Sequence, residues 1–198
     1  MNACKNATAV IAISTQTKND IIDFYKIPAE KIHVCYQSCN PAFAAICSEA
    51  EKTAVKEKYN LPGKYFLYTG SVIERKNLLN ICKAMKLLKP ELNIPLVVIG
   101  EGSSYKKIVL QYIKDNGLEQ QVIFLNDHPA IKATGAYVPA KDLPAIYQQA
   151  ICMVYPSFFE GFGIPVLEAL WSRLPVITSN ASCLPEAGGN AAIYVHPG

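Results

Sequence analysis

Short apolar runs alternate with amphipathic segments from residue 64 to residue 197. The runs are almost continuously hydrophobic, which is typical of parallel strands that are covered on both faces of a sheet. Between the runs, apolar residues recur at spacings of three and four, which predicts helices. The predicted strands are 64–70, 94–102, 121–126, 151–157, 174–179 and 191–197, and the predicted helices are 77–89, 103–117, 140–150 and 164–173. The segment 103–117 begins with a serine cap and ends with a glycine stop.

This order predicts an α/β fold with a Rossmann-like, doubly wound parallel sheet. Ligands of such sheets bind beyond the carboxyl ends of the strands. Here those ends carry the segments "TGSVIERKN", "GEGSS", "LNDHP", "PSFFEGFG" and "TSNASCLPEAGG". We therefore expect a binding site at this edge.

The pattern is weaker before residue 64 and between residues 126 and 137. Strands are predicted at 8–14 and 31–37, with a helix-like segment between them at 15–26. Pro41 and a polar cluster make 38–49 a connector, and 126–137 has no clear period and is predicted to be a long loop.

Composition and charge restrict the classes of function. Of 198 residues, 51% are hydrophobic and 18% charged, which suits a globular protein with a sizeable core. The net charge of +3 is too small to indicate a nucleic-acid partner but is compatible with an anionic ligand. Seven cysteines at irregular spacings and three scattered histidines do not predict a metal site, and the cysteines suit free thiols in the cytoplasm. No signal peptide or run of ~20 apolar residues is present, so no membrane segment is expected.

Two glycines precede the predicted helix at 164–173. Gly161 and Gly163 flank Phe162, and glycine lets backbone N–H groups approach a ligand closely. The start of a helix favours anions, so a phosphate would fit against residues 161–165. An ordinary strand-to-helix turn explains "EGFG" by itself equally well.

Two carboxylates bracket the same turn. Glu160 precedes the helix and Glu168 lies within it, and eight helical residues span at most ~12 Å. This is about the distance from sugar to ribose in a nucleotide-diphosphate sugar, and carboxylates accept hydrogen bonds from hydroxyl pairs. Arg75 and Lys76, on another loop of the same edge, would neutralise a diphosphate. Taken singly, these four residues also fit solvated loop or helix-end charges.

Several blocks of sequence resemble one family. "EGFGIPVLEA" resembles the E-x7-E signature of retaining glycosyltransferases of family four (glycosyl transferases group 1), which have the GT-B fold, and "YTGSVIERKNL" resembles their first donor-domain loop. "PLVVIGEG", "DLPAIYQQAICMVYPS" and "LPVITSNASCLPEAGGNAAIYVHP" match further blocks in the same order. The resemblance covers nearly the whole chain.

The resemblance implies roles for single residues. Glu160 would contact the hydroxyls of the donor sugar and Glu168 those of the ribose, while Lys76, with Arg75, would bind the diphosphate. Arg75, Lys76 and Glu160 are thus the implied catalytic residues. Many relatives carry arginine where this chain has Ser71, so Arg75 is expected to supply that charge. The remaining implied donor contacts are Gly70, Ser71, Gly161, Phe162, Gly163 and Ile164.

The resemblance also implies an organisation. Residues 1–40 would be a remnant of an N-terminal acceptor domain with the crossover strand, and 41–198 a donor-binding domain without its closing C-terminal helices. The chain would then be inactive alone, and apolar surface on the remnant would favour a homo-oligomer.

The implied activity is transfer of a hexose, of mannosyl or glucosyl type, from a nucleotide-diphosphate sugar to an acceptor glycan or lipid-linked glycan. Configuration would be retained, without metal or cofactor, in cytoplasmic polysaccharide biosynthesis, with the full-length protein peripheral to the inner membrane face. Two alternatives stay open: a non-catalytic nucleotide-sugar-binding module and a sugar-nucleotide epimerase of the same fold. A dehydrogenase is disfavoured, because no G-x-G-x-x-G opens a helix after a strand.

Overall fold

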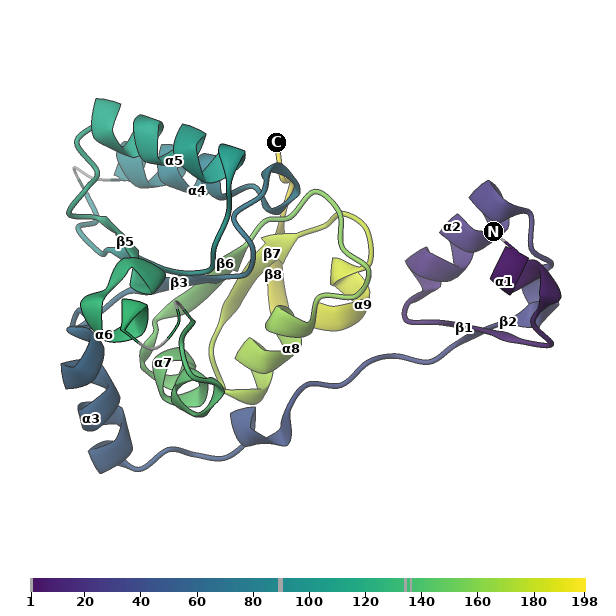
Figure 1. The fold of residues 1–198 in the computed structure, drawn as a ribbon, viewed down its shortest axis with the longest axis horizontal. Coiled ribbons are helices and arrows are strands. Elements are labelled where there is room, and N and C mark those ends of the chain that lie inside the picture. Colours follow the sequence, from purple (N-terminus) through teal and green to yellow (C-terminus); the bar gives the residue numbers. More distant parts are fainter. Residues whose placement is uncertain (1, 89–90, 134, 136) are drawn as a thin grey trace.

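The computed structural model describes residues 2–88, 91–133, 135 and 137–198. Its main feature is a six-stranded parallel sheet in the order β5-β4-β3-β6-β7-β8 (Figure 1). Two further parallel strands, β1 and β2, form a small separate sheet. The strands are β1 Val10–Ala12, β2 Ile32–Val34, β3 Phe66–Thr69, β4 Leu96–Ile99, β5 Val122–Phe124, β6 Cys152–Tyr155, β7 Val176–Ser179 and β8 Ala192–Val195. The predicted doubly wound α/β fold is confirmed.

Helices cover both faces of the large sheet (Figure 1). The α-helices are α1 Asn2–Asn6, α2 Thr15–Tyr25, α3 Glu49–Tyr59, α4 Leu78–Leu88, α5 Ser104–Asp115, α6 Pro129–Lys132, α7 Leu143–Gln149, α8 Ile164–Trp171 and α9 Leu184–Gly188. Short 3-10 helices are η1 Ala29–Lys31, η2 Pro41–Phe43, η3 Glu74–Lys76, η4 Leu125–Asp127 and η5 Ala140–Asp142.

The continuous apolar runs have a direct explanation in this packing. In β3, the side chain of Leu67 belongs to the core under α3, α7 and α8, whereas its neighbour Tyr68 belongs to the core under α4 and α5. Both are fully buried, because successive strand residues point to opposite, covered faces. A strand covered on both faces therefore needs apolar residues at every position.

The strand order places a switch point at the centre of the sheet. The chain moves from β3 outward through β4 to β5 and then returns to form β6 on the other side of β3. The loops after β3 and β6 consequently diverge and leave a crevice at the carboxyl edge, which is where ligands of such sheets bind. The parallel pairs Phe66↔Leu96 and Phe66↔Cys152 fix this register.

The structure differs from the sequence-based expectations in several segments. Helix α3 was not predicted, although Ser48 and Glu51 form a capping box at its start. The expected loop at 126–137 is wrong in part, because it contains the end of η4 and all of α6. The Ser103 side chain makes no capping hydrogen bond to α5.

Residues 2–34 form a separate small unit beside the large sheet (Figure 1). Its core is small and consists of Ala12, Ile27 and Ile32 with partly buried neighbours. An extended segment with little regular structure leads from β2 to α3. The unit nevertheless contacts the carboxyl edge of the large sheet, because Ser14 at the start of α2 bonds to Gly161.

Candidate active site

The loop after β3 brings two cations to the switch point. Gly70 follows β3 with φ 126°, and a Cβ built there would lie only 2.6 Å from Nζ of Lys76. Because glycine has no Cβ, the Lys76 side chain can lie against the end of the strand. Arg75 and Lys76 belong to η3, and Asn77, which follows η3, is in the left-handed conformation. The sequence of this turn thus directs both cations to the carboxyl edge.

The loop after β6 brings a carboxylate to the same place. Glu160 has only 9% of its surface exposed. The Ser157 hydroxyl donates a hydrogen bond of 3.0 Å to Oε1 of Glu160, while Ser182 contacts its backbone at both N–H and C=O. The carboxylate is therefore held in a defined orientation.

The two loops meet through ion pairs. Nη1 of Arg75 lies 2.8 Å from Oε2 of Glu160, and Nζ of Lys76 lies 3.6 Å from Oε1. The Tyr155 hydroxyl joins them, because it accepts a 2.7 Å hydrogen bond from Lys76 and donates a 2.9 Å hydrogen bond to Glu160. The three predicted catalytic residues thus lie together.

The charges at this cluster depend on one another. Burial would raise the pKa of Glu160, but the hydrogen bond from Arg75 and the charge of Lys76 outweigh it and lower the pKa. Burial lowers the pKa of Lys76, and the negative charge of Glu160 opposes that change. Glu160 is therefore ionised at neutral pH, so the cluster carries one anion between two cations.

Glu168 occupies a different environment on α8. Burial raises the pKa of its carboxyl, while a hydrogen bond from Tyr147 and the charge of Lys76 act in the opposite direction. The Tyr147 hydroxyl donates to Oε2 of Glu168 at 2.7 Å. One carboxylate oxygen is thus oriented by a buried tyrosine.

The turn between the two glutamates presents backbone donors. Gly163 has φ 105° and precedes α8, and a Cβ there would lie 2.9 Å from Cδ2 of Leu184. Among the described residues, the N–H groups of Gly161, Phe162, Gly163 and Ile164 have no hydrogen-bond acceptor. Phe162 itself is buried and its ring stacks on Tyr36 with centroids 5.7 Å apart. The turn combines free donors with a helix start, as an anion site requires.

A hollow of about 410 Å³ lies beside the cations, at the ends of β3 and β4. Thr69, Gly70 and Ser71 line one side of it, and Ser71 is exposed. Gly100 and Glu101 follow β4, while Asn126 and Tyr137 come from the segment after β5. Gly70 lines the hollow, and a Cβ at Gly70 would lie 2.6 Å from Nζ of Lys76, so the hollow adjoins the ion-pair cluster.

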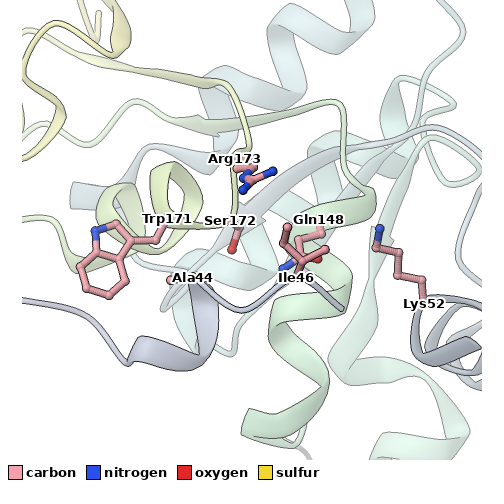
Figure 2. A pocket seen from close by; sticks show the side chains of 7 residues that line it. All are labelled: Ala44, Ile46, Lys52, Gln148, Trp171, Ser172 and Arg173. Carbon is pink, nitrogen blue, oxygen red and sulfur yellow. The ribbon is translucent and has the colours of Figure 1, made fainter. Parts of the chain in front are cut away.

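A second hollow, of about 200 Å³, lies at the other end of α8 (Figure 2). Trp171, Ser172 and Arg173 line it together with Ala44, Ile46, Lys52 and Gln148. It has no carboxylate and lies away from the carboxyl edge, because α8 runs from the EGFG turn toward β7. We therefore assign the candidate active site to the switch point.

Sequence reasoning missed Tyr155, Ser157 and Tyr147. The two tyrosines lie in apolar runs and read as core, and both are indeed fully buried. Their hydroxyls nevertheless bond to Glu160 and Glu168. A buried tyrosine needs a partner for its hydroxyl, and this was the only available signal.

Within the described ranges, no three His, Cys, Asp or Glu side chains gather as a metal-binding group. No helix in the part of the chain that the structure describes has the length and apolar character needed to cross a bilayer.

Comparison with known proteins gives consistent similarities. The chain is 32% identical over 195 residues to O-antigen chain mannosyltransferase B of Escherichia coli, covering 97% of this chain and 48% of that protein. It is also 32% identical over 193 residues to O-antigen chain mannosyltransferase RfbU of Salmonella typhimurium, covering 98% and 48%. The chain thus spans about half the length of the curated relatives it matches.

The fold is similar to that of Anabaena Alr3699/HepE in complex with UDP and glucose. The TM-score is 0.81 at 20% identity, over 98% of this chain and 51% of that chain. This likeness shows the fold, which is that of the C-terminal half of a GT-B glycosyltransferase. The model of the family "Glycosyl transferases group 1" matches residues 48–196. This match covers most of the chain, including its parallel sheet. We conclude that the chain belongs to the glycosyl transferases group 1 family.

Proposed function

We propose that this chain is the donor-binding part of a retaining, metal-independent hexosyltransferase. The observation that carries the proposal is the meeting of Arg75, Lys76 and Glu160 at the switch point of the sheet. Two cations around one oriented carboxylate suit a ligand that combines a diphosphate with sugar hydroxyls.

Each group has a place in this proposal. The diphosphate binds to Lys76 and Arg75 and to the free N–H groups at the start of α8. Glu160 accepts hydrogen bonds from the sugar, and Glu168 from the ribose. Gly70 and Ser71 border the hollow of about 410 Å³, which holds the nucleoside.

The mechanism rests on the leaving group. Lys76 and Arg75 neutralise the departing diphosphate, whose oxygen takes the proton of the acceptor hydroxyl on the same face of the sugar. The new glycosidic bond then forms on the face from which the diphosphate leaves, so the configuration is retained. Electrostatic stabilisation of this kind is usually the largest single contribution to catalysis.

The domain assignment is part of the same proposal. Residues 41–198 bind the donor, and residues 1–40 belong to the acceptor side and crossover. The acceptor is a glycan or a lipid-linked glycan, and it binds mainly to residues outside this chain. The reaction takes place in the cytoplasm. We therefore expect donor binding, with at most trace hydrolysis and no transfer, from the 198 residues alone.

The proposed sugar is mannose. The two curated relatives named above are O-antigen mannosyltransferases at 32% identity. Glucose is the second choice, because the similar Anabaena structure contains UDP and glucose.

Saturation-transfer NMR with GDP-mannose, UDP-glucose and free mannose tests the proposal. We expect saturation of the nucleotide sugars but not of free mannose, and a weaker signal in Lys76→Ala. Lys83→Ala is a matched control, because Lys83 is an exposed lysine on α4. Absence of binding for the whole panel, or equal binding by Lys76→Ala, would contradict the proposal.

A nucleotide-sugar-binding module without transfer is the second candidate. The observation that favours it is that the groups proposed to hold the donor, Arg75, Lys76 and Glu160, all lie within this chain. The two differ when the acceptor half is supplied: transfer by a protein that joins this chain to an acceptor domain supports the enzyme. Persistent donor binding without transfer supports the module.

A further inference from the structure

The amino end of α2 is bound by a carboxylate from another part of the fold. Oε2 of Glu186 accepts a 2.7 Å hydrogen bond from the N–H of Thr15, and Oε1 accepts a 3.0 Å hydrogen bond from the N–H of Gln16. Glu186 lies on α9, after β7, so it caps a helix that precedes it by most of the chain. A carboxylate at a helix start is favoured by the free N–H groups and the dipole there.

The same turn of α2 holds the glycine turn of the candidate site. The hydroxyls of Ser14 and Thr17 both donate to the carbonyl oxygen of Gly161, at 2.7 Å and 3.2 Å. Ser14 is fully buried and also caps α2, because it accepts from the N–H of Thr17 at 3.0 Å. The ring of Tyr36 stacks on Phe162 beside these bonds. One short segment therefore contacts both Glu186 and the turn after Glu160.

The geometry of the peptide group gives this contact a consequence. In a planar trans peptide, the C=O of one residue and the N–H of the next point in opposite directions. Since Ser14 and Thr17 hold the Gly161 carbonyl toward α2, the N–H of Phe162 is directed away from α2. That N–H is one of the donors without an acceptor among the described residues. A turn with two glycines has many alternative conformations, so holding one of them lowers the entropic cost of binding.

We propose that Glu186 is a positioning residue: it fixes the start of α2 against the turn Glu160–Gly163, so that the turn presents its N–H groups to the sugar diphosphate. This inference rests on the proposed function for its ligand. In this role Glu186 acts on the turn through Ser14, Thr17 and Gly161 rather than by binding the donor.

The charge of Glu186 supports this role. Burial would raise its pKa, but the hydrogen bonds from Gln16 and Thr15 outweigh burial and lower the pKa. The carboxylate is therefore ionised at neutral pH, when it binds the helix start most strongly.

The test compares Glu186→Gln with Glu119→Gln, a change at an exposed glutamate. The first measurement is amide hydrogen exchange by NMR without ligand. We expect the amides of Thr15 and Gln16 to exchange at least tenfold faster in Glu186→Gln and unchanged in Glu119→Gln. Unchanged exchange in Glu186→Gln would overturn the proposal.

The second measurement separates positioning from general stability. Calorimetric titration with GDP-mannose is compared with titration by guanosine, which lacks the diphosphate and the mannose. Glu186→Gln should weaken GDP-mannose binding about tenfold and leave guanosine binding within about twofold, and Glu186→Asp should restore part of the loss. Equal losses for both ligands would mean a merely structural role and would overturn the proposal.

Two provisions keep the failures distinguishable. If Glu186→Gln does not fold, Thr17→Val is used instead, because it removes one of the hydrogen bonds to Gly161. We expect Thr17→Val to weaken GDP-mannose binding but not guanosine binding. Unchanged GDP-mannose binding would overturn the proposal.

If the unaltered chain binds no nucleotide sugar, the proposed function fails. The positioning role is then tested by the chemical shift of the Phe162 amide. We expect Glu186→Gln to change this chemical shift, and an unchanged value would overturn the positioning role.

Discussion

Lys76 and Glu160, which come from the loops after β3 and β6, share one hydrogen-bond partner. Their charged groups are 3.6 Å apart, and both bond to the hydroxyl of Tyr155. The ring of Tyr155 also lies under the ammonium group, 5.0 Å from Nζ. Because Tyr155 ends strand β6, a rigid element of the sheet sets the separation of the two charges. The three groups therefore hold one another in place, and this organisation underlies the predictions below.

Lys76→Ala should lower turnover much more than donor affinity. In a protein that joins this chain to an acceptor domain, we expect kcat to fall by ~10²–10³, because Lys76 stabilises charge that develops on the leaving diphosphate. Steady-state kinetics and calorimetric donor titration measure the two quantities separately. Lys83→Ala should leave both unchanged. A fall confined to donor affinity, with kcat intact, would contradict the assigned role.

Glu168→Gln should weaken donor binding and stabilise the fold. The folded-state pKa of Glu168 is raised, so stability declines as pH rises from the unfolded pKa through the folded one, and the ionised carboxylate is unfavourable at neutral pH. Glutamine removes that cost and can still accept from Tyr147. We expect a higher melting temperature at pH 7, no difference at pH 3, and donor affinity about tenfold lower, because hydrogen bonds to charged acceptors are stronger. A lower melting temperature at pH 7 would show that the charge is stabilising.

Glu160→Gln should make the protein less stable at pH 7, the opposite of the effect expected for Glu168→Gln. The folded-state pKa of Glu160 is lowered, so its contribution is present above the unfolded pKa of about 4.3 and is lost as pH falls through the folded pKa. Urea denaturation from pH 3 to pH 7 should therefore show the variant less stable at pH 7 and its difference shrinking below about pH 4.3. Glu57→Gln, at an exposed glutamate of α3, serves as the control. A constant difference across this range would exclude the ion pairs as its cause.

Gly163→Ala should destabilise the fold by ~1–3 kcal/mol, the usual cost of a side chain in a sparsely populated backbone region. Its φ of 105° disfavours alanine, and the new Cβ would contact Leu184 at 2.9 Å. Gly63→Ala is the matched control, because no atom lies within 4 Å of a Cβ there. We expect the control to change the free energy of unfolding by less than ~1 kcal/mol. Equal effects in chemical denaturation would show that the conformation at Gly163 is not required.

Donor binding should survive chelation. Arg75, Lys76 and the start of α8 supply the positive charge, so the dissociation constant for GDP-mannose should be the same with and without EDTA. Calorimetry in both buffers checks this expectation. Affinity that falls with EDTA and returns with Mg²⁺ would require a metal in the site.

Local pattern in the sequence was sufficient for the sheet. All six predicted strands from residue 64 onward are present. A strand covered on both faces, such as β4, must be apolar throughout, and that signal is local. The edge strand β8 is apolar too, although Ile193 and Val195 are exposed. Helix α3 was not predicted, because it has only two buried residues, Val55 and Tyr59, among many charged ones. Its capping box at Ser48 and Glu51 was the available signal.

The sequence by itself also determined which loops form the candidate site, because all carboxyl ends of a parallel sheet lie at one edge. Only the tertiary structure decided the partners: Tyr155 between Lys76 and Glu160, Tyr147 on Glu168, and Glu186 at the start of α2. These contacts join residues that are distant in sequence, and they depend on which strands are neighbours and where the small N-terminal unit lies. Hydrophobic periodicity reports how each residue is covered, whereas a hydrogen bond depends on atomic positions that arise only when the strands and loops have packed together.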